Sequence, residues 1–517
     1  MSETRADLKG ESGFVQHGSG ARRGLWSKLL LLSTALLGGV EAPAQYDPPA
    51  TPAPYNPIAL AEVTGTPRAA VQAGPSNGQT LTQNPYLGGV SSGKVSAVTV
   101  GLSLEDAVSL GLKQNLGGDL ATDVVTDALG RRWQALSHLL PNVVTDTGFG
   151  VHQVNVKAAF GLSIPGEPRI IGPFGYFDSR AYFTQSVFDW ASVEGARSSQ
   201  AQLNAAEFSS KDAREIIVLV IVSNYLLAVA DQSEVESATS QRDTAKTLFR
   251  QTSDQKTAGL ASAVDVLRSQ VQLQSREQKL IVAQNSLAKQ KLALARAIGL
   301  PLEQRYEITT HVPYQELTPS TLDDAIQSAL KVRPDIQSQM NRVRSAELEK
   351  KAATAERYPS LGVESDYGLS GVNPGSSHGT VDAAATLSIP IFQGGRVHGD
   401  VLRADASLTR ERQQLEDLRA RIDQEVRDAY LDLDAAAQEV SVEKSAITLA
   451  TQNLQQSRDR FASGVTDNIE VVQAQDALAI ASDAYIASLY SYNLAKISLA
   501  RATGVAVSRF AEYVEGK

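Results

Sequence analysis

The 517-residue sequence contains no cysteine. This absence excludes disulfide bonds, thiolate metal sites, cysteine nucleophiles and a lipid attached to an N-terminal cysteine. Aromatic residues are only 6% of the chain, which is low for a large globular core and normal for long interlocking helices. The net charge of −9 makes a nucleic-acid-binding surface unexpected.

Motifs for catalysis are also missing. The six histidines are scattered without the spacing of metal ligands, and the sequence has no P-loop, dinucleotide fingerprint or nucleophile elbow. We therefore predict that the protein is not an enzyme and that it binds no cofactor and no metal.

The N-terminus, residues 1–44, is predicted to be an export signal. A basic stretch that includes Arg22 and Arg23 precedes the apolar run Leu29–Val40, and an A-x-A site ends at Ala44. This order is typical of a secretory signal peptide. A membrane anchor would need a longer apolar core, and the paired arginines leave twin-arginine export open. No later stretch approaches eighteen uninterrupted apolar residues, so no further transmembrane helix is expected.

Residues 45–101 are rich in Pro, Gly, Ala, Thr and Asn. Such a segment buries too little apolar surface to offset the entropy lost on ordering. We therefore predict a flexible leader.

The rest of the chain is an internal duplication. The run SLEDAVSLGLKQN at Ser103 resembles TLDDAIQSALKVR at Thr321, 218 residues later. Further on the offset becomes 205, as in the pairs Tyr225/Tyr430, Gly259/Gly464 and Gly299/Gly504. The duplication predicts a first repeat at 102–300, a linker at 301–320, a second repeat at 321–507 and a C-terminal tail at 508–517.

Each half predicts the same order: helix, strand, loop, strand, very long helix, break, long helix. Residues 361–369 and 381–389 alternate between apolar side chains and small or polar ones, and the first half repeats this pattern. The chain therefore has four predicted strands. Alternation over about ten residues suits a membrane β-strand, and it fits a half-buried strand of a soluble sheet equally well.

The long helices carry a sustained seven-residue repeat, formed by Val426, Leu433, Val440, Ile447, Leu454 and Phe461, and on the next helix by Val471, Leu478, Tyr485, Tyr492 and Leu499. Sustained heptads predict coiled-coil packing. A helix of roughly 60 residues extends on the order of 90 Å. A second stripe of small residues, formed by Ala474, Ala481, Ala495 and Ala502, predicts neighbours on both sides, as in the wall of a cylinder.

Four strands are too few to close a barrel around a pore. Since open strand edges cannot face lipid, a membrane form of this fold requires several chains to share one barrel. Pro390, Gly394 and Gly395 then mark a junction where a strand leaves the membrane and becomes a helix, because glycine tolerates unusual backbone dihedrals.

Three features carry a family resemblance: the segment IPIFQGGR (Ile389–Arg396), the duplication, and GVTDNIEVVQAQDAL (Gly464–Leu478). Together they are similar to the outer-membrane efflux proteins, the TolC-like channels, over most of the chain. The resemblance implies a mainly helical fold with membrane β-structure: a homotrimer with one twelve-stranded barrel in the outer membrane and a long coiled-coil tunnel in the periplasm. The first junction, SVFDWASVEG, departs from the pattern because it lacks the proline and the glycine pair.

The same resemblance implies a transport function. The protein would be a passive exit duct for small molecules in a tripartite efflux system, working with a periplasmic adaptor protein and an inner-membrane transporter. The outer-membrane component of type I protein secretion stays open as an alternative. An alternative from another class is a soluble periplasmic coiled-coil adaptor. Such adaptors carry one hairpin flanked by lipoyl-like β segments, whereas here two hairpins each follow a strand pair.

Candidate pore residues come from the resemblance at the two helix–helix turns. Asp265 and Glu470 match acidic positions that ring the narrow end of the pore. At neighbouring family positions this chain has Gln473 instead of an acid, Thr466 instead of a base, and Phe461 where some members have tyrosine. Six carboxylates in a trimer would favour cations. The alternative is that Asp265 and Glu470 are solvated carboxylates at helix starts, favoured by the helix dipole.

Gly259 and Gly464 are predicted to break the helix pairs as left-handed or turn residues. By the same resemblance, the grooves beside them are candidate docking sites for the adaptor.

The export signal yields a first testable prediction: protein isolated from the cell envelope begins at Gln45. Cleavage after Ala44 removes residues 1–44, and intact mass spectrometry measures the difference. Retention of the whole segment would contradict the export signal.

Overall fold

The computed structural model describes residues 84–91, 95–155, 158, 161, 170–310, 314–317, 319–466 and 468–516. The chain divides into two units, Met1–Asn77 and Gly78–Lys517, and the description below concerns the second. The predicted signal peptide, its cleavage site and most of the predicted leader lie outside the described residues.

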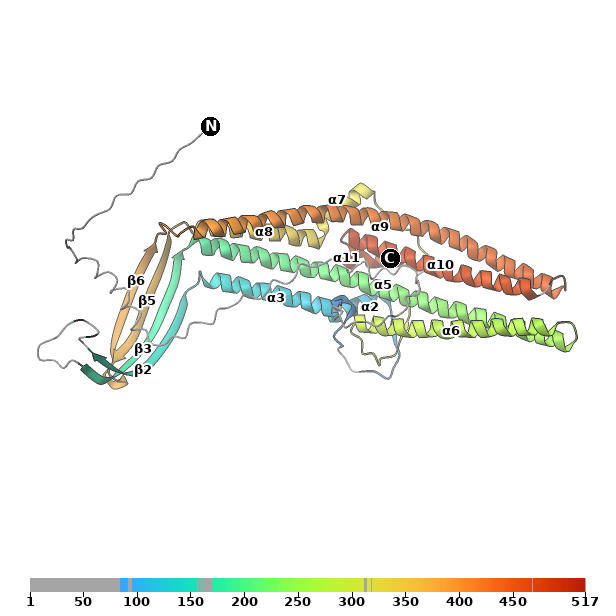
Figure 1. The fold of residues 1–517 in the computed structure, drawn as a ribbon, viewed down its shortest axis with the longest axis horizontal. Helices are drawn as coiled ribbons and strands as arrows, with labels where there is room; N and C mark the ends of the chain where they lie inside the picture. Colours follow the sequence, from blue (N-terminus) through green and yellow to red (C-terminus); the bar gives the residue numbers. More distant parts are fainter. Residues whose placement is uncertain are drawn as a thin grey trace, which may run out of the picture. The chain divides into compact units, whose positions relative to one another are not determined.

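The two halves contain the same succession of elements (Figure 1). The first half comprises α2 (Leu104–Gln114), α3 (Leu116–Ser137), β2 (Asn142–Asn155), β3 (Ile170–Phe188), α5 (Trp190–Thr257) and α6 (Ala263–Ala297). The second comprises α7 (Leu322–Val332), α8 (Pro334–Ala355), β5 (Ser360–Gly371), β6 (His378–Ser388), α9 (Arg396–Ala462) and α10 (Asn468–Ala502). The predicted order is confirmed except that two helices, and not one, precede the first strand of each half. The two longest helices, α5 and α9, have 68 and 67 residues.

One antiparallel sheet gathers the four predicted strands in the order β2-β3-β5-β6. The two halves of the chain meet where β3 pairs with β5. The outer edges of β2 and β6 pair with no strand in the described part of the chain. Figure 1 shows the strands at one end of the long helices and the two helix–helix turns at the other.

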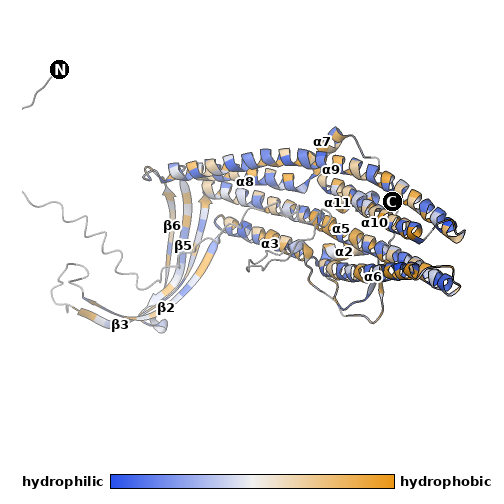
Figure 2. Ribbon diagram, turned by 45° about the vertical axis from the view of Figure 1, so that its right-hand side comes forward, coloured by the Kyte–Doolittle hydropathy of each residue, from blue (hydrophilic) through white to orange (hydrophobic). Residues whose placement is uncertain are grey.

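The register separates the sheet into two chemical faces, because directly paired residues point to the same side. Apolar partners share one face, as in Leu361 with Leu387 and Tyr367 with Val381. Figure 2 shows hydrophobic and hydrophilic residues interspersed along the strands, as alternation requires. The predicted separation into an apolar and a polar face is confirmed.

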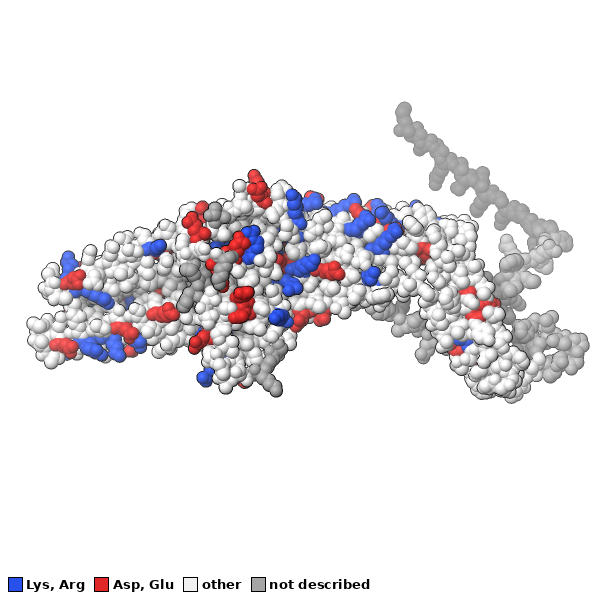
Figure 3. Space-filling model, turned by 180° about the vertical axis from the view of Figure 1, so that it is seen from behind, with Lys and Arg blue, Asp and Glu red and all other residues white. Residues whose placement is uncertain are grey.

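The polar face carries a charged link across three strands. Arg180 on β3 forms an ion pair with Asp366 on β5 and donates a hydrogen bond to Thr380 on β6, at 2.9 Å. Asp178, on the same strand as Arg180, lies 3.5 Å from the guanidinium. Charged side chains are otherwise sparse on the sheet and dense on the helices (Figure 3). The polar face is thus the side expected to meet water.

The heptad residues form the helical core. Ile422 and Val426 are fully buried, and the second stripe of small residues is buried as well, at Ala474, Ala481, Ala495 and Ala502. Helix α10 packs against both α9 and α5. The predicted pair of seams is therefore confirmed for α10.

Helix α5 contains a stretch that is long and apolar enough to cross a membrane by composition. Of this stretch, 72% is buried inside the structure, and residues such as Ile217 and Ile221 lie in the main hydrophobic cluster. The stretch therefore behaves as a core helix within the described part of the chain.

Parts of the predicted leader and linker belong to the core. Strand β1 (Val100–Leu102) pairs in parallel with β4 (Tyr306–Ile308), and the Tyr225 hydroxyl donates a hydrogen bond to the carbonyl of Leu102 at 2.9 Å. This parallel pair was not predicted, because three-residue strands carry no readable alternation.

The segment Asn84–Val90, within the predicted leader, is also seated on the helices. The Asn115 amide donates to the carbonyls of Tyr86 and Ala297, at 2.7 and 2.9 Å. The Tyr86 ring packs so closely on Gly117 that a Cβ at this glycine would lie 2.3 Å from the nearest ring atom, Cδ1. The prediction of a flexible leader is therefore corrected for this segment, whose contacts come from residues distant in sequence.

The predicted C-terminal tail is a packed helix, α11 (Ala506–Glu515). Val514 is buried in the main cluster, and the Val507 amide donates to the Glu215 carboxylate on α5 at 3.2 Å. The tail boundary at residue 508 is therefore corrected, because α11 begins at Ala506.

A buried arginine joins three helices of the second half. Arg333 donates to Asp335 and to Glu425, both at 2.6 Å, and to the carbonyl of Ala502 at 3.2 Å. Burial by itself raises the pKa of Asp335, but the hydrogen bond and charge of Arg333 outweigh it, so the pKa is lowered. The guanidinium thereby ties the start of α8 to α9 and α10.

The two faces of the sheet give a second prediction. Val363→Arg or Leu387→Arg places charge on the apolar face, which costs roughly 2–4 kcal/mol per site at mid-bilayer. Three copies should impair assembly, measured as loss of the folded oligomer on a heat-modifiability gel. Glu364→Gln on the polar face is the control and should assemble normally; equal behaviour of all three variants would contradict the assignment of faces.

Candidate functional site at the helix–helix turns

Both helical hairpins end in the same glycine turn. Gly259 and Gly464 have φ values of +76° and +70°. The residue after each glycine donates back to the helix, from Leu260 to Gln255 at 2.8 Å and from Val465 to Arg460 at 3.0 Å. A Cβ at either glycine would meet nothing within 4 Å, so backbone conformation and not space requires glycine. The predicted turn positions are confirmed.

Asp265 closes a capping box at the start of α6. Its carboxylate accepts from the Ser262 amide at 3.1 Å, and its own amide donates to the Ser262 hydroxyl at 3.2 Å. Arg268 lies 3.6 Å from the same carboxylate, which is 23% exposed. The residue thus stabilises the helix start, while part of its charge faces solvent.

The second turn places its polar residues differently. Glu470, in the first turn of α10, lies 3.4 Å from Arg460 at the end of α9 and is 38% exposed. Gln473 is exposed one turn further along, and Thr466 is half-buried in the turn itself. Phe461 packs half-buried against Val471 and its neighbours.

The sequence analysis missed the residue that connects the two turns. Asn468 is fully buried, and its amide donates to the Asp265 carbonyl at 2.9 Å. Its side-chain oxygen has no hydrogen-bond partner among the described residues. A signal was present, because Asn468 stands three residues before Val471 in the heptad pattern and so occupies a buried seam position.

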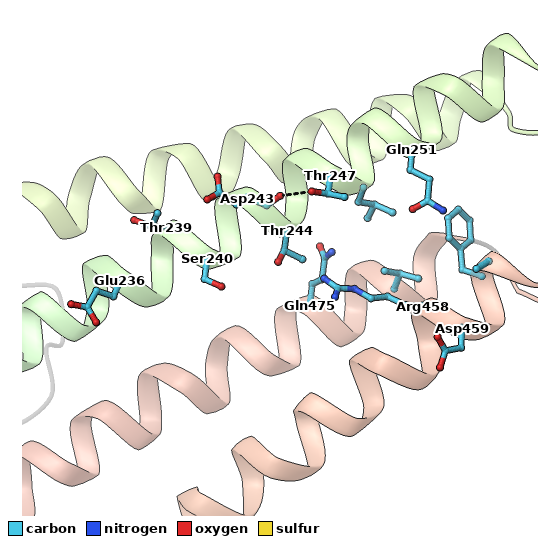
Figure 4. A pocket seen from close by; sticks show the side chains of 14 residues that line it. Glu236, Thr239, Ser240, Asp243, Thr244, Thr247, Gln251, Arg458, Asp459 and Gln475 are labelled. Carbon is cyan, nitrogen blue, oxygen red and sulfur yellow. Dashed lines mark hydrogen bonds between the residues drawn. The ribbon is translucent and has the colours of Figure 1, made fainter. Parts of the chain in front are cut away.

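A polar cleft of about 740 Å³ lies between α5 and the α9–α10 hairpin near the turns (Figure 4). Its α5 side presents mainly hydroxyl and carboxylate groups, with Glu236, Ser240 and Asp243 among them. Arg458 and Asp459 lie on the opposite wall, on α9. This arrangement suits a polar protein surface better than a small apolar ligand.

The two hairpins are also joined by ion pairs, which the sequence analysis did not predict. On α10, Asp476 accepts from Gln272 at 2.7 Å and pairs with Arg276. Seven residues further along α10, Asp483 pairs with Lys279 at 2.5 Å. These contacts hold α6 against α10 within one chain.

The strand–helix junctions use different chemistry in the two halves. Gly394 and Gly395 have φ values of +61° and +87°, and Gly395 is the N-cap of α9, as the glycine pair after Pro390 predicts. In the first half, Asp189 caps α5 by accepting from the Ala191 amide at 3.0 Å. A carboxylate cap therefore replaces the glycine pair there.

Among the described residues no group of three or more His, Asp or Glu side chains is arranged to hold a metal ion. The site is thus built from turns, a polar cleft and ion pairs between helices. A family model described as outer membrane efflux protein matches residues 137–300 and 325–505, one stretch in each half.

The chain belongs to the outer membrane efflux protein family.

Curated relatives of this efflux protein are similar over much of their length. The alkaline protease secretion protein AprF of Pseudomonas aeruginosa is 24% identical over 410 residues, which cover 75% of this chain and 83% of that protein. The pyoverdine export outer membrane protein OpmQ of the same species is 24% identical over 323 residues, covering 61% of this chain and 67% of that protein.

Solved structures have the same fold at low identity. The CmeC outer membrane channel of Campylobacter jejuni gives a TM-score of 0.68 with 17% identity, over 85% of this chain and 94% of that chain. VceC of Vibrio cholerae gives 0.65 with 20% identity, over 78% and 96%. The efflux protein is thus a trimeric channel of the outer membrane with four barrel strands per chain and a helical tunnel, and it is a transport duct and not an enzyme.

The glycine turns generate a third prediction. Gly464→Ala forces a Cβ into the left-handed region, at a cost of roughly 1–2 kcal/mol, and should speed amide exchange over residues 461–466, measured by hydrogen–deuterium exchange. Gly399→Ala is the control: Gly399 lies inside α9, a Cβ there would meet nothing within 4 Å, and helix propensity favours alanine by up to about 1 kcal/mol. Unchanged exchange at the tip in Gly464→Ala would contradict the turn assignment.

Proposed function

We propose that this efflux protein is the exit duct for small molecules in a tripartite system that spans the envelope. The observation that carries the proposal is the pair of duplicated helical hairpins, which end in matched turns far from the sheet. A duct needs no catalytic groups, but it needs an opening at the end opposite the membrane and a surface there for its partners.

The partner at this end is a periplasmic adaptor, which in turn joins an inner-membrane transporter. The polar cleft between α5 and α9–α10 and the turns at Gly259 and Gly464 form the docking surface. Two observations support this. The cleft opens next to the turns, and its walls carry charges of both signs, which suits recognition of a protein surface.

A second candidate is the outer-membrane component of type I protein secretion. One observation favours it: the alkaline protease secretion protein AprF is similar to this chain over 83% of its own length. The pump and the adaptor decide between the two roles, since the duct itself has the same architecture in each.

One experiment separates these roles. In a strain of the source bacterium that lacks the gene, a small-molecule duct predicts increased cell accumulation of a fluorescent efflux substrate and an unchanged set of secreted proteins. Protein secretion predicts the reverse. Complementation with the wild-type gene should restore the lost activity, and Val363→Arg should not. A deletion strain that is normal in both assays would contradict both roles.

At the narrow end of the duct, Asp265 and Glu470 of three chains are proposed to form a ring of six carboxylates, with Gln473 beside them. Each carboxylate is partly exposed and has a single arginine nearby, Arg268 or Arg460. Such a ring attracts multivalent cations. The capping role of Asp265 is compatible with it, because the Ser262 hydrogen bonds use only one carboxylate oxygen, Oδ2, while Oδ1 lies 3.6 Å from the exposed side chain of Arg268.

The ring gives a fourth prediction. Asp265→Asn combined with Glu470→Gln should abolish block by a trivalent cation and reduce cation preference, measured in single-channel recordings in planar bilayers. Asn at 265 still accepts the Ser262 hydrogen bonds, so the trimer should persist. If both carboxylates only serve their helix starts, block and selectivity will be unchanged, and the constriction lies elsewhere.

A further inference from the structure

A basic and aromatic pocket of about 420 Å³ lies between α5, α8 and α9, at the end of these helices that adjoins the sheet. Its aromatic part is formed by Trp190, the first residue of α5, and by Tyr358, which follows the end of α8. Its basic part includes Lys350, Lys351 and Arg412. None of these residues belongs to the helix–helix turns or to the polar cleft beside them.

The pocket opens on the same side as the apolar face of the sheet. Phe188, the last residue of β3, is paired with Leu361, which is paired with Leu387 on that face. The Trp190 ring lies beside the Phe188 ring, with 6.4 Å between the centroids. The pocket that Trp190 lines is therefore continuous with the lipid-facing side of the barrel and begins where that side ends.

The pocket also lies at the depth of the lipid head groups. Trp190 and Tyr358 are at the level where strands become helices, and Trp and Tyr side chains favour the membrane–water boundary. Lys351 stands seven residues before Tyr358, which is on the order of 10 Å along a helix. The head-group layer is roughly 5–7 Å thick, and a lysine side chain carries its charge several ångströms from the backbone. The ammonium is thus within reach of lipid phosphates.

The charges around the pocket are unequal. Glu347 accepts hydrogen bonds from Arg412 at 2.9 Å and from Arg344 at 3.4 Å, so one carboxylate is shared by two guanidinium groups. Lys350 is paired with Asp405 at 2.7 Å. These contacts leave a positive surplus even before Lys351 is counted, although the whole chain has a net charge of −9.

Lys351 supplies a cation that is free to bind. Its side chain is exposed, and among the described residues it takes part in no hydrogen bond or ion pair. The duplication shows that the fold does not require these charges. The position equivalent to Lys351 in the first half, 218 residues earlier, is Trp133, and the position equivalent to Arg412, 205 residues earlier, is Glu207. Helix packing alone therefore does not account for the two cations.

We propose that this pocket binds the head group of an anionic phospholipid in the periplasmic leaflet of the outer membrane. Lys351 binds the phosphate, Arg412 adds positive charge behind it, and the rings of Trp190 and Tyr358 lie against the start of the acyl chains. Charge-assisted hydrogen bonds from ammonium and guanidinium groups suit a phosphodiester. The proposal depends on the membrane location and not on the cargo.

Each chain holds a complete site. Helix α5 follows β3 and helix α8 precedes β5, and these are the two middle strands of the sheet. The pocket is therefore centred within the wall of one chain, whereas copies join at the edges of β2 and β6. We expect three equivalent lipid sites in the trimer.

Native mass spectrometry of the whole trimer, released from detergent with added phosphatidylglycerol, tests the proposal. We expect up to three retained lipids per trimer, and weaker retention of phosphatidylcholine, whose head group is neutral overall. Lys351→Gln should weaken retention of phosphatidylglycerol about five-fold, the effect expected for one basic side chain at an anionic membrane surface. Lys351→Arg keeps the charge and should bind as the wild type does. The matched control is Lys444→Gln, at an exposed lysine of α9 remote from the sheet.

Two results would overturn the proposal: equal retention of the two lipids by the wild type, or unchanged retention of phosphatidylglycerol in Lys351→Gln. Inorganic phosphate at millimolar concentration should not displace the lipid. Displacement would mean that the pocket binds a free anion and not a membrane lipid, and would also contradict the proposal. Since Lys351 has no partner within the described chain, Lys351→Gln should leave the melting temperature of the lipid-free trimer unchanged.

Tryptophan fluorescence gives a second, independent readout. In a chain without residues 1–44, Trp133→Phe leaves Trp190 as the one tryptophan. In vesicles of phosphatidylglycerol and phosphatidylcholine in equal amounts, bromine on the phosphatidylglycerol chains should quench Trp190 more strongly than bromine on the phosphatidylcholine chains. Adding Lys351→Gln should remove this difference. Equal quenching by the two lipids before that change would show contact with bulk lipid only, and no head-group site.

Discussion

The unpaired edges of β2 and β6 are the constraint on which the rest of the molecule depends. In hydrocarbon an unpaired backbone amide or carbonyl costs several kcal/mol, and no water is present to satisfy it. Four strands cannot bend round to satisfy each other, so the barrel closes only when copies share it. The position of each strand in the shared barrel then fixes the position of the helix that follows it. Coiled-coil packing maintains these positions along the length of the tunnel.

Duplication gives this wall its regularity and its asymmetry. The turns at Gly259 and Gly464 have the same left-handed backbone conformation, and the heptads run in the same phase through both hairpins. The charged partners have diverged, with Asp476 where the first hairpin has Val271. The two hairpins of a chain therefore differ in charge at equivalent positions, although their turns have the same backbone conformation.

Most of the architecture could be predicted from the sequence, because the same spacing of apolar residues recurs many times along each long element. The heptads of α9 and α10 and the alternation in β5 and β6 are of this kind. Single contacts could not be predicted. The Asn115 amide donates hydrogen bonds to the carbonyls of Tyr86 and Ala297, which are far apart in the chain. No pattern in the sequence near Asn115 predicts these two partners. At the tip, Asp265 was predicted to lie at the first turn, either in the pore ring or as a carboxylate at a helix start. The hydrogen bond that it receives from Asn468 could not be predicted, because it depends on how the two hairpins meet.

The two ends of the described chain are seated on the same part of α5. Gly118, just past the seat of Asn84–Val90, lies against Ile217, and Val507 at the start of α11 is bonded to Glu215. Both ends are thus tied near the middle of a 68-residue helix, away from the strands and from the turns. Both segments pack on one hydrophobic cluster, which contains Val514 and contacts Tyr86. Removing either segment would therefore loosen the middle of α5 and leave the strands and the hairpin turns in place.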